Sequence, residues 1–170
     1  MRFDATELSA GELALQREVR AFLAGELGDG VALWMCSPGY IERTVIPHVR
    51  AGRERAGLGL EGFEIAAALD VSLTSDAEGA RTVLRPRFQR YASLPNYRRM
   101  LDASGFDEHL ARGEVTDAML HDLAGIGDER ALREAVRRYR DAGCTLPIVG
   151  PFAQHEGAAG FEASLEAAIA

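Results

Sequence analysis

The sequence predicts an alternating α/β fold with a parallel sheet, and three short apolar runs carry that prediction. These runs lie at residues 30–36, 63–70 and 143–152. They follow stretches with helical spacing, and the last one closes on Gly150 and Pro151. A helix that leads into a short buried strand and then a turn is the repeating unit of α/β folds. We therefore expect about three strand–helix units.

The composition is that of one ordinary folded domain. The chain has 170 residues, 47% hydrophobic and 26% charged, so it is long enough for a sizeable core and too apolar for a disordered chain. The net charge of -7 argues against nucleic acid as a partner. Most arginines are interleaved with acids at helical spacing, and we interpret them as solvated helix faces rather than as a binding patch.

The sequence contains no membrane, disulfide or metal pattern. No run reaches 18 apolar residues, and the N-terminus is charged where a signal peptide would be apolar. We therefore expect a cytoplasmic protein without a membrane partner. Cys36 and Cys144 are the only cysteines, and they have no metal-type spacing. Both fall in predicted strands, where a buried thiol is the ordinary outcome.

The first predicted helix covers residues 7–27. Charged residues cover much of its surface, and one side is apolar: Leu8, Leu15, Val19, Phe22 and Leu23. Ser9 and Glu12 have the spacing of a capping box, so a start at Ser9 is an alternative to one at Thr6. The Gly-Asp-Gly sequence at residues 28–30 ends this helix.

The first predicted strand, residues 31–36, leads into a second helix. Ser37 has the chemistry of an N-cap, and Pro38 suits the first helical turn. Pro47 lies inside this helix and is expected to kink it, because proline lacks the N–H that the helix needs. The helix has an apolar stripe at Ile41, Val45 and Val49.

The second predicted strand is followed by a third helix, which residues 74–76 can cap. We expect residues 85–125 to form an insertion of several short helices, interrupted at Pro86 and Pro95. Asp128 then caps a well-formed helix that leads into the third strand. A last helix has apolar side chains four residues apart at Phe161, Leu165 and Ile169.

The usual catalytic motifs do not identify an enzyme. Residues 57–62 match the glycine fingerprint of dinucleotide-binding proteins, but a helix precedes them and a strand follows, which is the reverse of the order that the fingerprint requires. We interpret them as a turn. The four histidines show no zinc-binding pairing, and the sequence has neither a nucleophile elbow nor a phosphate-binding loop. No catalytic residue is predicted.

The carboxyl ends of the predicted strands are the best candidates for a binding site. Ligands bind there in parallel α/β folds because strand-end loops and helix N-termini converge on that edge. The positions selected in this way are Trp34, Cys36, Ser37, Asp70, Ser72, Gly150, Pro151 and Phe152. Ser37 heads a helix and could offer backbone amides to an anion. The alternative for each of these residues is helix capping or core packing.

Several segments in sequence order resemble one enzyme family. The chain is similar to the C-terminal part of the luciferase-like oxidoreductases that use flavin or deazaflavin, over roughly residues 24–170. The matching segments are residues 29–38, 45–47, 52–57, 63–67, 91–97, 100–101, 105–106, 127–128, 139–143 and 149–152.

That resemblance implies a (β/α)₈ barrel with a helical insertion, a small-molecule substrate, and reduced FMN or coenzyme F420 as cofactor. A complete barrel needs about 250 residues. We therefore expect an incomplete barrel of about three parallel strands, with impaired activity and doubtful cofactor binding by this chain alone. It would self-associate or pair with a complementing fragment. The alternative is a catalytically silent fragment that acts as an oligomerising or packing unit.

The N-terminal 27 residues show a different resemblance. Residues 1–8 and 14–24 are similar to the opening helix of acyl-CoA dehydrogenases. We therefore predict two parts, an N-terminal amphipathic helix at residues 1–27 and a partial luciferase-like α/β domain at residues 28–170.

Overall fold

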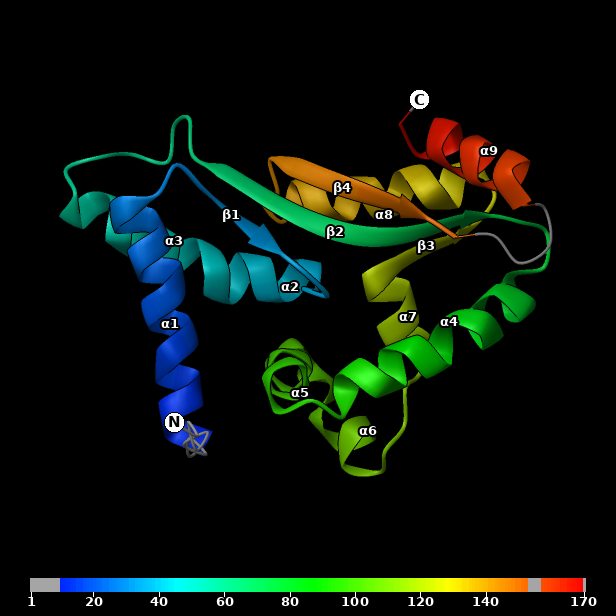
Figure 1. Cartoon of the computed structure of the whole chain (residues 1–170), viewed down its shortest axis with the longest axis horizontal. Coiled ribbons are helices and arrows are strands. Elements are labelled where there is room, and N and C mark those ends of the chain that lie inside the picture. The colour runs from blue at the N-terminus through cyan, green and yellow to red at the C-terminus, as the bar shows by residue number, and fades with distance from the viewer. Residues whose placement is uncertain (1–9, 153–156, 170) are drawn as a thin grey trace, which may run out of the picture.

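The structure is a computed structural model that describes residues 10–152 and 157–169, and its centre is a parallel sheet (Figure 1). The strands in this part of the chain are β1 (Gly30–Leu33), β2 (Glu64–Leu73), β3 (Ala124–Gly127) and β4 (Leu146–Pro151). All three strand pairings are parallel. The α/β class and the three expected strands are confirmed, and β3 is an additional strand.

The long strand β2 organises the sheet, because every other strand pairs with it. Ala66 in its first half pairs with Ala32 of β1 on one side and with Leu146 of β4 on the other. Asp70 in its second half likewise lies between Ala124 of β3 and Gly150 of β4. Strands β1 and β3 therefore follow each other along one edge of β2, and β4 occupies the opposite edge.

The helices follow the predicted order closely. They are α1 (Ala10–Leu27), α2 (Pro38–Tyr40), α3 (Ile46–Arg55), α4 (Ala77–Ala92), α5 (Pro95–Leu101), α6 (Asp107–Ala111), α7 (Asp117–Leu123), α8 (Glu129–Asp141) and α9 (Gly157–Ile169). Side chains of Ser37, Asp76 and Asp128 cap α2, α4 and α8, as expected. The proposed capping box at Ser9 lies outside the described residues.

Two expectations about proline have different outcomes. A π-helical segment, η1 (Ile41–Val45), joins α2 to α3 directly before Pro47. A wider turn is one known way to accommodate a disrupted backbone ladder, and Pro47 itself lies in the first turn of α3, where its missing N–H is tolerated. The expected interruption at Pro86 is wrong, because α4 runs through it. Leu84 and Phe88, which flank Pro86, are both buried. Their packing holds the helix together where Pro86 cannot donate a backbone hydrogen bond.

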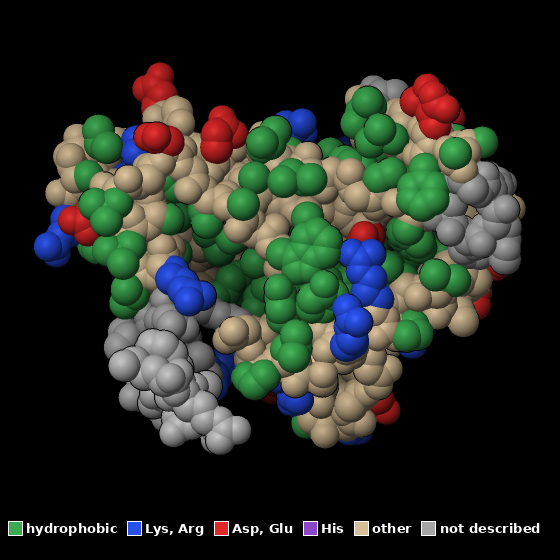
Figure 2. All heavy atoms as spheres, in the orientation of Figure 1, with side chains coloured by type: hydrophobic (Ala, Val, Ile, Leu, Met, Phe, Trp, Pro, Cys, Tyr) green, Lys and Arg blue, Asp and Glu red, His purple; other side chains and the backbone are tan. Residues whose placement is uncertain are grey.

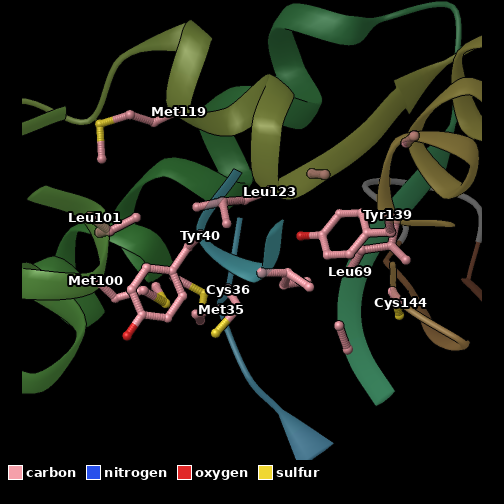
Figure 3. Close-up of a cluster of buried hydrophobic side chains, with 14 of the residues drawn as sticks. Met35, Cys36, Tyr40, Leu69, Met100, Leu101, Met119, Leu123, Tyr139 and Cys144 are labelled. Carbon is pink, nitrogen blue, oxygen red and sulfur yellow. The ribbon is translucent and has the colours of Figure 1, made fainter. Parts of the chain in front are cut away.

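The main core lies on one face of the sheet. In Figure 1, α8 lies behind β2 and β4, and the buried side chains of α8 include Leu132, Ala135 and Tyr139. Alternate residues of β2, including Leu69 and Val71, are buried as well. Figure 3 shows part of this core, where Tyr139 and Leu69 lie together. The opposite face of the sheet is turned to the viewer in Figure 1. Ala68 and Asp70, which alternate with Leu69 and Val71 along β2, belong to this face.

Candidate functional site

Trp34, Asp70 and Gly150 come together on the face of the sheet opposite α8. Gly150 is the register partner of Asp70, and a Cβ added to Gly150 would lie 3.5 Å from Asp70 Oδ1. The three residues border a hollow of about 60 Å³. Its lining is otherwise apolar: Met35, Ala68, Leu69, Phe88, Leu123 and Ile148. Since Trp34 follows β1 and Gly150 lies near the end of β4, this hollow is at the carboxyl edge of the sheet.

The turn after β1 is what brings Trp34 to this place. Met35 has a φ of 58°, in the left-handed region that residues other than glycine seldom adopt. Its side chain is buried in the core, which holds the unusual conformation in place. Trp34 is left 45% exposed beside the hollow. A large aromatic surface is therefore presented to solvent at a point where the backbone is strained.

Arg87 of α4 completes the site, although it is not among the residues that the strand ends predict. Its Nη1 donates to Asp70 Oδ1 at 3.0 Å, and its guanidinium carbon lies 5.5 Å from the centre of the Trp34 ring. The second distance is that of a cation–π contact. The sequence pattern predicts instead that the arginines of this region are solvated. The available signal was Asp70 itself, because an acid within an otherwise apolar strand requires a partner when it is buried.

A row of aromatic rings extends from the site along α4 and α5. The Trp34 and Tyr91 rings are 6.4 Å apart and the Tyr91 and Tyr97 rings are 5.0 Å apart, both in edge-to-face orientation. Arg90 lies over Tyr91 at 5.7 Å. Figure 2 shows hydrophobic side chains gathered near the middle of this face, with basic side chains beside them. The surface next to the hollow is therefore both aromatic and cationic.

Burial dominates the electrostatics of Asp70. Its side chain is only 13% exposed, and this desolvation raises the pKa of the carboxyl group, while the charge of Arg87 and its hydrogen bond lower the pKa and offset part of the rise. Tyr139 also interacts with Asp70, but burial raises the pKa of this phenol, so it stays neutral where Asp70 titrates. The charged neighbour of Asp70 is therefore Arg87.

The raised pKa predicts how stability depends on pH. Folded Asp70 holds its proton to a higher pH than unfolded Asp70 does. Between the two pKa values the folded state therefore binds more protons than the unfolded state, and the protein loses stability as the pH rises through this range. Asp70→Asn removes this titration. The variant should therefore gain free energy of unfolding relative to wild type as the pH rises above about 4, the ordinary pKa of aspartate. Urea unfolding at a series of pH values measures the difference, and a relative loss of stability over this range would contradict the assignment.

The other five sequence candidates do not share this hollow. Ser37 is fully buried, where its hydroxyl accepts a hydrogen bond from the Tyr40 amide and lies 2.7 Å from Ser104 Oγ, so it caps a helix rather than facing a ligand. Ser72 is buried in β2, and Phe152 packs against the core. Pro151 borders a shallow groove beside α9. These positions match the alternative of capping and packing.

Cys36 borders a second, larger cavity of about 380 Å³ beside β1. This cavity lies between α1, β1, the α2–α3 region and α5. Polar groups in its lining include Arg20, His48 and Asn96. Cys36 and Cys144 are both buried, as expected, and they form no disulfide, but β1 ends before Cys36 and β4 begins after Cys144, so neither lies in a strand. In the described part of the chain, no group of three or more His, Cys, Asp and Glu side chains is placed to hold a metal ion.

The parallel sheet and the hollow at its carboxyl edge place the chain among the parallel α/β proteins. Comparison of the sequence with family profiles identifies the family. The profile of the luciferase-like monooxygenases matches residues 14–146. The chain therefore belongs to the luciferase-like monooxygenase family. The match begins inside α1, whereas the resemblance of residues 1–27 to acyl-CoA dehydrogenases stays a prediction. No curated protein matched the sequence.

Two solved structures show the same fold. An F420-dependent secondary alcohol dehydrogenase, solved in complex with an F420–acetone adduct, matches with a TM-score of 0.64 and 19% identity over 90% of this chain and 47% of that chain. The coenzyme F420-dependent tetrahydromethanopterin reductase from Methanopyrus kandleri matches with a TM-score of 0.62 and 20% identity, over 79% and 42%. The chain thus spans less than half the length of either enzyme.

The prediction that this chain has the fold of part of a luciferase-like barrel is therefore confirmed. Within the described residues the sheet has four strands, and each of β1, β3 and β4 pairs only with β2. In these ranges no helix is both long and apolar enough to cross a membrane.

Proposed function

We propose that this chain is part of an oxidoreductase that uses a flavin or a deazaflavin, and that the hollow at Trp34, Asp70 and Gly150 forms one wall of the cofactor and substrate site. The observation that carries this proposal is the half-exposed Trp34 beside an apolar hollow at the carboxyl edge of the sheet, in a chain of this family. Ligand sites of parallel α/β folds lie at this edge.

The residues of this wall suit a planar, mostly apolar ring. From β2 the hollow is lined by the small side chain of Ala68, and Ile148 adds an exposed apolar surface from β4. Trp34 can stack on such a ring and exclude water from it. Arg87 lies beside Trp34 at the edge of this wall. When bound, FMN or coenzyme F420 would supply hydride or oxygen chemistry, and these residues would bind and orient it.

Substitution of Ala68 by leucine tests the proposal. Ala68→Leu fills the hollow, whereas Ala159→Leu adds the same atoms at an exposed position of α9. Equilibrium dialysis against FMN and coenzyme F420, each oxidised and reduced, should show binding by wild type and by Ala159→Leu. We expect Ala68→Leu, once its fold is confirmed by circular dichroism, to bind at least tenfold more weakly, because the ring loses its contact area. Equal binding by both variants would overturn the proposal.

We propose that tight binding and turnover need a second chain. The hollow has a volume of only about 60 Å³, so a bound ring would keep much of its surface in water. Drug-sized ligands usually bury most of their surface when they bind. A second copy or a complementing fragment that covers the open side would therefore raise affinity, and this chain alone should show impaired activity.

A second candidate function is a packing or oligomerising unit, and the surface of α9 supports it. Phe161, Leu165 and Ile169 are all exposed at helical spacing, and a groove lined by Pro151 and Leu165 runs beside them. We expect self-association through this stripe. Analytical ultracentrifugation should show an assembly that dissociates in Leu165→Glu and persists in Glu166→Gln, a polar exchange at the neighbouring exposed position. A wild-type chain that stays monomeric at high concentration would remove this candidate.

A further inference from the structure

We propose that Arg87 is a specificity-determining residue that recognises a carboxylate or similar small anion on the substrate, next to a planar apolar group that contacts Trp34. This inference rests on the proposed function and names the substrate class for the same site. Its starting point is the geometry of the guanidinium, which lies against Asp70 on one side and over the Trp34 ring on another.

The contacts of Arg87 hold it in place without using up its donors. A guanidinium has five N–H donors, and the hydrogen bond to Asp70 uses Nη1. The side chain is 35% exposed, so its other donors face solvent beside the hollow. Asp70 and Trp34 already fix the orientation of Arg87. Binding of an anion therefore costs less side-chain conformational entropy than it would at an unrestrained arginine.

The local charge also favours an anion. Arg90 lies over Tyr91, which contacts Trp34, and within the described residues no carboxylate is in ion-pair distance of Arg90. The side chains that form the site and the aromatic row beside it therefore include two guanidinium groups, of Arg87 and Arg90, and one carboxylate, of Asp70. In a chain with a net charge of -7, a cationic patch bordered by aromatic rings is an exception, and it complements a ligand that is both planar and negative.

Benzoate and benzamide provide matched probes for this recognition. They are nearly the same shape, and only benzoate is charged at neutral pH. Trp34 is the only tryptophan of the chain, so its fluorescence reports contact at this site. We expect benzoate to produce a saturable change and to bind about tenfold more tightly than benzamide, the preference that a charge-assisted hydrogen bond provides. Added salt should weaken the binding of benzoate and leave benzamide unaffected.

Charge-neutral variants separate recognition from folding. Arg87→Gln should abolish the preference for benzoate, whereas Arg130→Gln, which removes the same charge from an exposed position on α8, should keep it. If Arg87→Gln unfolds because Asp70 loses its partner, the double variant Asp70→Asn with Arg87→Gln restores a neutral pair and should show the same loss of preference. Equal binding of the two probes by wild type, or an unchanged preference in a folded Arg87 variant, would overturn the inference.

Titration in the presence of cofactor distinguishes this inference from the proposed function. Simultaneous binding of benzoate and FMN or coenzyme F420 supports a substrate anion at Arg87, whereas mutual exclusion would assign the anion site to the cofactor and overturn the inference. A chain that binds cofactor without any preference for benzoate keeps the proposed function and removes the inference. A chain that prefers benzoate but binds no cofactor, even when a second chain covers the open side of the sheet, keeps the anion site and removes the proposed function.

Discussion

Phe88→Ala should lower the free energy of unfolding by about 3–5 kcal/mol, the usual cost of removing a buried phenylalanine ring. Phe88 is 1% exposed and lies in the middle of α4, where it borders the same hollow as Asp70 and Leu123. Its loss would leave a cavity between α4, α7 and the sheet. Because Arg87 is the adjacent residue, we also expect the ion pair with Asp70 to loosen. Urea unfolding followed by circular dichroism measures the loss.

Val83→Ala on the same helix is the matched control. Val83 is 55% exposed, and its truncation should change stability by no more than about 0.5 kcal/mol. Similar effects of the two substitutions would mean that α4 does not pack on the sheet through Phe88, and the position of Arg87 beside Asp70 would lose its structural basis.

Gly52→Ala should cost about 1–3 kcal/mol, although alanine is the better helix former by about 1 kcal/mol. Gly52 of α3 lies directly against α1. A Cβ at this position would collide with the carbonyl oxygen of Phe22 and lie 2.8 Å from the amide nitrogen of Glu26. Gly25 of α1 makes an equally close approach to Val49 of α3. Since these contacts are with backbone atoms, α1 has to move away as a unit.

Gly59→Ala serves as the comparison for this substitution. A Cβ on Gly59 would have its nearest neighbour at 4.0 Å, and its φ lies outside the restricted positive range. Thermal unfolding should therefore show a lower Tm for Gly52→Ala and nearly the wild-type Tm for Gly59→Ala. If Gly52→Ala instead raises the Tm, helix propensity outweighs the close contact, and α1 does not pack on α3 as described.

The order of helices and strands was predictable because local chemistry specifies it. Caps at Ser37, Asp76 and Asp128 and the apolar runs of β2 and β4 are visible in the sequence itself. Strand β3 was not visible, since Ala124–Gly127 has two glycines and no strand-like pattern. It forms through pairing with β2 and close packing on α8, where a Cβ at Gly125 would lie 2.8 Å from Ala135 Cβ.

The site was predictable in position but not in composition. Strand ends indicated Trp34, Asp70 and Gly150, because any parallel sheet gathers such residues at one edge. Arg87 is 17 residues from Asp70 and comes close only because α4 packs back across the end of the sheet. Nor does the sequence distinguish Ser37, which turns inward as a cap, from Trp34, which turns outward directly before the strained Met35.

Titration with oxidised FMN and with coenzyme F420, followed by the fluorescence of Trp34, shows whether the cofactor binds against this residue. We expect saturable quenching of this single tryptophan, retained in Ala159→Leu and lost in Ala68→Leu. Cofactor that binds, by its own absorbance, without any change in Trp34 emission would contradict the placement of the site. The absence of binding even when the open side of the sheet is covered by a second chain would contradict the proposed function itself.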